Sequence, residues 1–125
     1  MSVTEAELKA KLVLKLRTQH KNYVVLRHED RFRVGIPDMS VTGNKITSWW
    51  EAKYANPHVR SRGAQELAML RLGRAGIAYY IIYHEEGGIR RTGIVHPGEI
   101  KTLAGAWVEG FDHQFVIDFI MRIHE

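Results

Sequence analysis

The strongest constraint on the fold of this chain is a hairpin signal before its midpoint. Two β-favouring runs, at about residues 39–41 and 46–52, flank the tetrapeptide Thr42-Gly43-Asn44-Lys45. A Gly-Asn pair between such runs is typical of a two-residue hairpin loop. The sequence therefore predicts an antiparallel hairpin with Gly43 and Asn44 as its loop and with Thr42 paired to Lys45.

The predicted pairing determines which polar side chains share a face of the hairpin. Asp38 then lies opposite Trp49. Because side chains alternate along a strand, Asp38 shares that face with Glu51 and Lys53. Asp38 and Glu51 become diagonal neighbours, roughly 7 to 8 Å apart between backbones, so that the two carboxylates can share one ion. A four-residue loop keeps this arrangement, whereas a three-residue loop turns Asp38 to the other face.

The residues of this hairpin resemble those of a known enzyme superfamily. Gly35-Ile36-Pro37-Asp38, followed by Trp50-Glu51-Ala52-Lys53 and by a helix that carries Gln65, is similar to the PD-(D/E)xK nucleases, most of all to their VRR-NUC and Holliday-junction-resolvase-like branch. The similarity covers about residues 5–83 in the order of elements. It implies an α/β fold with a three-layer, restriction-endonuclease-like core, in which helices flank a mixed β-sheet in the order α-β-β-β-α-β-β-α.

The resemblance also implies an activity and assigns roles to residues. It implies a magnesium-dependent phosphodiesterase, with Mn²⁺ as a substitute, in which Asp38 and Glu51 bind the metal and the main-chain carbonyl of Ala52 is a further ligand. Lys53 is implied to orient or help deprotonate the attacking water and to offset charge on the phosphate. Oxygen ligands suit such a hard cation, and a metal-bound water loses its proton more readily. The alternative is a surface hairpin in which Glu51 and Lys53 form a solvated ion pair.

Length and composition agree with this interpretation. We expect the 125 residues to form a single domain, 1–125, and the formal net charge of +4 favours polyanionic partners such as DNA. The chain has no cysteine, which excludes zinc-finger and disulfide frameworks. No signal peptide or membrane-spanning run is recognised, so we expect no membrane partner and a cytoplasmic location, in the host cell if the protein is phage-encoded.

An amphipathic helix is predicted at the start of the chain. Thr4 and Glu7 have the spacing of a capping box, and apolar leucines recur at helical spacing from Leu8 to Leu16. Three lysines are expected mostly on its solvent-exposed side: Lys9, Lys11 and Lys15. Glu5 is different, because 100° per residue places it in register with Leu12, in the apolar stripe. Many nucleases of the resembled superfamily carry an additional acidic ligand on this helix. We therefore take Glu5 as a candidate metal ligand, the alternative being that it only caps a frayed first turn.

Apolar patterns predict the remaining elements. The run from Ile77 to Tyr83 is short, apolar and aromatic, as in a buried parallel strand, so a right-handed strand-helix-strand crossover is expected to contain it. Residues 97–111 are expected to be irregular. The other predicted elements are a strand from Tyr23 to His28, a helix from about Arg62 to Ala75 capped by Ser61, an edge strand from Ile89 to Val95, and a helix capped by Asp112 that ends near Ile123.

Basic residues follow the predicted metal site directly. Arg60 and Arg62 are placed at the start of the helix after Lys53, where contacts with phosphates would supply affinity without sequence information. The alternative is an ordinary solvated arginine-rich face. Gln65 matches a position where the resembled branch carries a glutamine near the site, and His58 lies in the loop that precedes the helix. We take these four as candidate substrate-binding residues.

These observations together predict a metal-dependent endonuclease that hydrolyses DNA by attack of an activated water, with branched DNA as one candidate substrate. A homodimer is expected, because a small nuclease that cuts two strands needs two active sites. The resemblance includes nucleases of phages and mobile elements. Two alternatives stay open: a non-catalytic nucleic-acid-binding module, and a nuclease subunit that is active only in a larger assembly.

Overall fold

The structure is a computed structural model that describes residues 3–28, 35–60 and 63–125. Over these ranges the chain forms an α/β fold with three α-helices, one 3-10 helix and a six-stranded mixed sheet. The elements in chain order are α1 (Glu5–Gln19), β1 (Val24–Arg27), β2 (Met39–Gly43), β3 (Ile46–Ala55), α2 (Gly63–Ala75), β4 (Ile77–Glu86), β5 (Ile89–Val95), η1 (Pro97–Glu99), β6 (Ala106–Glu109) and α3 (His113–Ile123).

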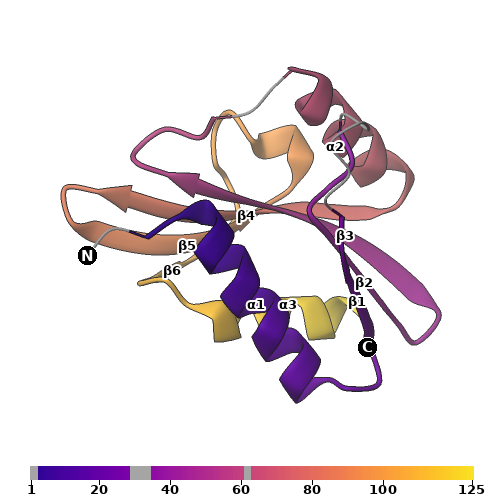
Figure 1. The fold of residues 1–125 in the computed structure, drawn as a ribbon. Helices are drawn as coiled ribbons and strands as arrows, with labels where there is room; N and C mark the ends of the chain where they lie inside the picture. Colours follow the sequence, from indigo (N-terminus) through magenta and orange to yellow (C-terminus); the bar gives the residue numbers. More distant parts are fainter. Residues whose placement is uncertain (1–2, 29–34, 61–62) are drawn as a thin grey trace.

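The strands lie in the sheet in their chain order, β1-β2-β3-β4-β5-β6. Only β3 and β4 run parallel, and α2 connects them, as predicted. The other neighbouring strands pair antiparallel. Figure 1 shows α1 and α3 on one side of the sheet and α2 on the other. The mixed α/β class predicted from the sequence is therefore confirmed.

Each face of the sheet carries its own apolar core. One core packs α1 and α3 against the strands and buries Leu12 and Trp50. The other core packs α2, through Met69, against strand residues such as Ile82. Trp49 belongs to the α2 side because it alternates with Trp50 along β3. The sheet thus has two separate layers of helices over its two faces.

The helix caps follow the predicted chemistry. The side chain of Thr4 accepts a hydrogen bond from the Glu7 backbone at 3.2 Å, and that of Asp112 accepts one from the Phe115 backbone at 2.9 Å. Each bond satisfies a backbone N–H that has no partner within its helix. The predicted Ser61 cap lies outside the described residues. No helix in the described ranges has both the length and the apolarity that crossing a membrane would require.

The hairpin forms, but its loop is one residue further along than predicted. Gly43 pairs with Ile46, so Asn44 and Lys45 are the loop, with φ angles of 53° and 65°. Positive φ at both positions is the signature of the turn that matches strand twist. The Tyr23 ring lies where a Cβ of Gly43 would be, so only glycine fits at this strand position. The shift of one residue changes each pairing by two numbers, so the predicted parity of faces survives.

The C-terminal third differs from the prediction. Residues 97–111, expected to be irregular, contain the 3-10 helix η1 and the strand β6. Strand β5 has the predicted bounds, but it is not an edge strand, because β6 pairs with its outer side. β6 has only four residues and no alternating apolar pattern, so its pairing depends on the neighbouring strand and not on its own sequence.

Candidate functional site

Asp38 is the residue before β2, and it contacts Glu51 directly. Its backbone N–H donates to Glu51 Oε1 at 3.0 Å, and its own Oδ2 accepts from the Ala52 backbone at 2.9 Å. The Asp38 carbonyl accepts from the backbone of His28 at 2.8 Å, which ties the segment to β1. The Glu51 carboxylate is therefore held by the backbone just before β2, and the Asp38 carboxylate by the backbone of β3.

Gly35 explains how the chain enters this position. Its φ is +98°, and a Cβ there would lie 2.7 Å from the Cβ of Ala68 on α2. Only glycine tolerates both the backbone conformation and the close contact. The start of the motif that precedes Asp38 is thus packed against α2, which brings this helix over the site.

Glu51, Lys53 and Gln65 form a closed set of contacts on the α2 side of the sheet. Lys53 Nζ donates to Gln65 Oε1 at 2.7 Å and lies 3.3 Å from Glu51 Oε2. Gln65 Nε2 donates to the same Glu51 oxygen at 2.7 Å. Glu51 and Lys53 are buried, with 1% and 8% of their surfaces exposed. Gln65, predicted to bind substrate, bridges these two charged side chains in the structure.

Glu5 and Lys9 reach the same site from α1. Glu5 Oε1 accepts from the Tyr54 backbone at 2.8 Å, and Glu5 Oε2 lies 3.3 Å from Lys9 Nζ. Lys9 Nζ donates to Asp38 Oδ1 at 2.9 Å. Glu5 thus points toward the site, as predicted, but an ammonium group separates it from Asp38.

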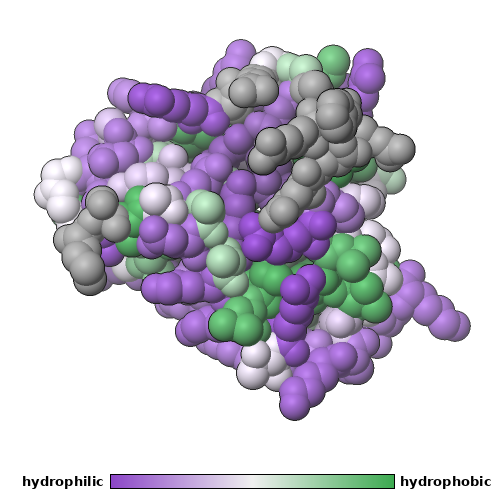
Figure 2. Space-filling view, in the orientation of Figure 1, coloured by the Kyte–Doolittle hydropathy of each residue, from purple (hydrophilic) through white to green (hydrophobic). Residues whose placement is uncertain are grey.

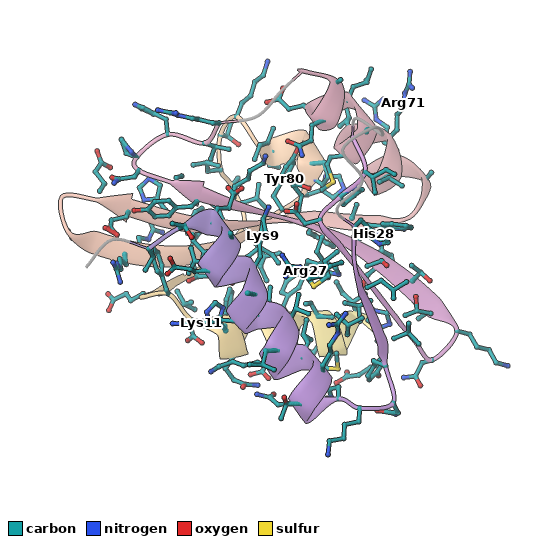
Figure 3. All side chains as sticks on the ribbon, in the orientation of Figure 1. Lys9, Lys11, Arg27, His28, Arg71 and Tyr80 are labelled. Carbon is teal, nitrogen blue, oxygen red and sulfur yellow. The ribbon has the colours of Figure 1, made fainter. Side chains whose placement is uncertain are left out.

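Lys9 was expected on the solvent-exposed side of the helix, and this is corrected by the structure. Its side chain is only 19% exposed and faces the strands, whereas Lys11 and Lys15 are exposed as predicted. Figure 3 shows Lys9 on the sheet side of α1 and Lys11 away from it. The inward position of Lys9 could have been predicted from the sequence, because Lys9 follows Glu5 by one helical turn and must share its face.

The burial of the charges perturbs two pKa values. Burial raises the pKa of Glu51 to about 7, and the charge of Asp38 adds to the rise, while Lys53 and Lys9 oppose it. Burial alone would lower the pKa of Lys9, but the hydrogen bond and charge of Asp38, with the charges of Glu5 and Glu51, raise it overall. The rise in the pKa of Glu51 thus comes first from its removal from water and only then from the neighbouring charge of Asp38.

Tyr80 adds an unsatisfied polar group to the site. It is the register partner of Glu51 on β4 and is fully buried. Its hydroxyl has no hydrogen-bond partner among the described residues. Burial, together with the charges of Glu51 and Glu66, raises its pKa above the ordinary tyrosine range, so it stays protonated. An unpaired buried hydroxyl costs about 1–3 kcal/mol, which a ligand or water oxygen beside Glu51 would recover.

The donor set has the chemistry of a hard-cation site. The carboxylates of Asp38, Glu51 and Glu5 converge with only oxygen donors, and against Lys9 and Lys53 the fully ionised set has a net charge of −1. Among the described residues, no three acidic or histidine side chains already have the spacing of a formed metal centre. In this structure the ammonium group of Lys9 lies between Glu5 and Asp38 and contacts both carboxylates.

The other predicted substrate residues are not drawn into the cluster. His58 and Arg60 are exposed in the loop between β3 and α2. Arg62 lies outside the described residues. Exposure is compatible with contact to a large ligand, and it gives no geometric assignment by itself.

Comparison with known proteins gives no further assignment. No family model matches the chain, and no curated protein sequence matches it. The function must therefore be inferred from the residues and the geometry of the site described above.

Proposed function

We propose that the protein is a metal-dependent nuclease of the PD-(D/E)xK type that hydrolyses phosphodiester bonds in DNA. The observation that carries this proposal is the pair of opposed, backbone-anchored carboxylates, Asp38 and Glu51, with the buried ammonium of Lys53 held 3.3 Å from Glu51. A buried charge cluster is costly to a fold, so its presence is itself an indication of function. The mixed sheet between α1 and α2 is compatible with a restriction-endonuclease-like core.

Asp38, Glu51 and the main-chain carbonyl of Ala52 would hold Mg²⁺ or Mn²⁺, with Glu5 as a further ligand. Bound there, the ion would lower the pKa of its water and offset charge on the phosphate. The net charge of −1 on the ionised cluster supports this assignment, because a divalent ion would convert it to +1, the sign that attracts a phosphodiester. The raised pKa of Glu51 means that the ion competes with a proton for this carboxylate near neutral pH.

Lys53 would stabilise charge on the reacting phosphate and orient the attacking water. Its contacts with Gln65 and Glu51 fix the ammonium group before substrate arrives. Such preorganisation is effective because little reorganisation is then required during the reaction. Tyr80, whose buried hydroxyl has no described partner beside Glu51, is placed to donate a hydrogen bond to an oxygen bound in the site.

DNA and a second copy of the chain are the partners we propose. The net charge of +4 and the exposed Arg60 and His58 near the site favour a polyanion. For the dimer, β1 is an outer strand, and Val24 and Leu26 on one of its faces are 55% and 50% exposed. Figure 2 shows an apolar area on the side of the molecule where β1 runs in Figure 1. Outer strands with exposed apolar residues favour pairing with another chain.

A cleavage assay with matched variants tests the proposal. Purified protein is incubated with supercoiled plasmid and with branched DNA, in magnesium, manganese or chelator. Asp38→Asn and Glu51→Gln should each lower cleavage by more than about a hundredfold, because losing a ligand charge unseats the ion. The control is Glu7→Gln. Glu7 is exposed on α1, so this variant should cleave DNA as the wild type does. Normal turnover by either site variant would disprove the assigned centre.

One observation favours a second candidate, a binding module without turnover. Lys9 already neutralises Asp38, so the cluster is paired without any metal. This alternative predicts DNA binding that is indifferent to magnesium and no cleavage of any substrate. A subunit active only within a larger assembly would also look inactive alone, but the activity of that assembly would disappear with Glu51→Gln.

A further inference from the structure

A pocket of about 490 Å³ lies apart from the charge cluster. It is lined by His84, Arg91, Thr102, Leu103, Ala104, Gly105 and Trp107. Its volume falls within the usual range for small-molecule sites, roughly 300–1,000 Å³. It combines one aromatic side chain, one guanidinium, one imidazole and one hydroxyl. This is a suitable set for a ligand that has both a flat ring and a negative charge.

Trp107 is fixed in this pocket by its surroundings. Its indole Nε1 donates to the Leu103 carbonyl at 2.9 Å. The ring lies against β5 at Gly93, where a Cβ would be 2.5 Å from the ring, so no larger residue fits. The Arg91 guanidinium lies over the ring, 4.7 Å from its centroid, so a base that stacks on this face takes the place of the guanidinium. No carboxylate among the described residues lies within ion-pair distance of Arg91. The indole is thus preorganised, and Arg91 retains its charge for an anion.

The register of the sheet places this pocket on the same face as the proposed catalytic residues. Lys53 pairs with Ile82, Ile82 with Gly93, and Gly93 with Trp107, so the four form one row across β3 to β6. Directly opposed residues point to the same face of a sheet. Three strand spacings separate Lys53 from Trp107, about 14 Å in total. A few nucleotides of an extended strand cover such a span.

The loop after β3 adjoins the same region. Ala55, the last residue of β3, pairs with His84, which in turn pairs with Arg91. His58 and Arg60 are exposed in the loop that begins there. Lys53, the start of this loop and the pocket therefore belong to the same face of the sheet.

We propose that this pocket binds one unpaired nucleotide of the DNA strand that is cut, with its base stacked on Trp107 and its phosphate on Arg91. The inference rests on the proposed nuclease function and adds to it a substrate class, DNA that is single-stranded near the scissile bond. Base stacking on an aromatic ring accepts any base, because every base has a π-face. In a duplex the bases are already stacked on one another and cannot stack on Trp107, so we expect the pocket to favour single-stranded DNA over duplex DNA.

Binding of labelled oligonucleotides in chelator tests this proposal without requiring cleavage. The variants are Trp107→Leu, which keeps an apolar side chain, and Arg91→Ala. Arg90→Ala is the matched control, because Arg90 is the preceding residue, points to the other face and lies over Phe111. Trp107→Leu should weaken binding of a single strand by about tenfold, the size of one base-aromatic stack. Thermal denaturation checks that each variant is folded.

An abasic strand of the same length separates the two contacts. It keeps the phosphates and lacks the bases, so Trp107→Leu should no longer matter, while Arg91→Ala should still weaken binding. Wild-type affinity of both variants for every strand would overturn the proposal, as would an equal effect of Trp107→Leu on normal and abasic strands. If either of these results is found while cleavage still depends on Glu51, the nuclease function stands and the pocket inference fails. Base-dependent binding without cleavage of any substrate would instead overturn the nuclease function alone.

Discussion

The charge cluster has two halves that differ in burial, and Asp38 joins them. On the α2 side Glu51 and Lys53 are almost completely buried, and Gln65 bridges them. On the α1 side the side chains of Glu5 and Lys9 are 36% and 19% exposed. The electrostatic cost of the first half is therefore large, whereas water screens much of the second.

This difference indicates a division of roles. The buried half cannot rearrange easily, because each of its charges would lose its partners in a region with little water. The exposed half can exchange Lys9 for another cation at small cost, since its ammonium group is partly hydrated. We infer that the α2 half provides the reaction chemistry and that the α1 half adjusts how strongly the site attracts a metal ion.

Replacement of Lys53 should have the largest effect on turnover. Lys53→Met keeps the length of the buried stem and removes the charge, so single-turnover cleavage should fall by about a hundredfold or more. Metal binding, measured by calorimetry, should persist because an ammonium group is not a ligand. Loss of metal binding in a folded Lys53→Met protein would show that Lys53 has a structural role. The division of roles between the α2 half and the α1 half would then be wrong.

The buried half should also make stability depend on pH. The pKa of Glu51 is raised from 4.5 to about 7, so its stabilising contribution is fully present below about pH 4.5 and is lost as pH rises to about 7. Each pKa unit corresponds to about 1.4 kcal/mol in the free energy of unfolding. Urea denaturation in chelator should therefore show wild type losing stability relative to Glu51→Gln across this window. If the free energy of unfolding changed with pH in the same way in both proteins, the pKa of Glu51 would not be raised in the folded state.

A smaller effect is expected in the exposed half, where Lys9 competes with a metal ion for Asp38 Oδ1. Lys9→Met removes a positive charge and frees that oxygen, so magnesium affinity should rise by a few fold, on the order of 1 kcal/mol. Lys11→Met is the control, because Lys11 is exposed on the same helix. Isothermal titration of both variants decides the matter. A fall in affinity for Lys9→Met would show that this lysine supports the metal site.

The smallest effect is expected for Glu5. Glu5→Gln keeps an oxygen that can accept from the Tyr54 backbone, so the fold should be unaffected, while magnesium affinity should fall by a few fold at most. Glu7→Gln, exposed on the same helix, should be silent. Equal affinities in the two variants would exclude Glu5 from the metal site and would reduce the α1 half to a structural contact.

The sequence determined much of this arrangement through local rules. Alternation along strands predicted a shared face for Asp38, Glu51 and Lys53. In the structure Glu51 and Lys53 meet at Gln65 of α2, whereas Asp38 also contacts Lys9 of α1. Helical spacing predicted that Glu5 points toward the sheet. Cap chemistry predicted the ends marked by Thr4 and Asp112. These inferences depend only on residue spacing and on short-range hydrogen bonds, which a sequence specifies directly.

The tertiary structure decided the features that depend on distant residues. The hairpin loop is at Asn44 and Lys45, where distant residues make contacts: the Tyr23 ring lies against Gly43, and Asn44 Nδ2 donates to the His124 carbonyl at 2.6 Å. The short strand β6 exists because β5 offers it a partner. The contact of Lys9 with Asp38 joins residues that are 29 positions apart in the chain. Spacing fixes the directions of side chains within one element, but only packing between elements fixes which charges meet and how deeply they are buried.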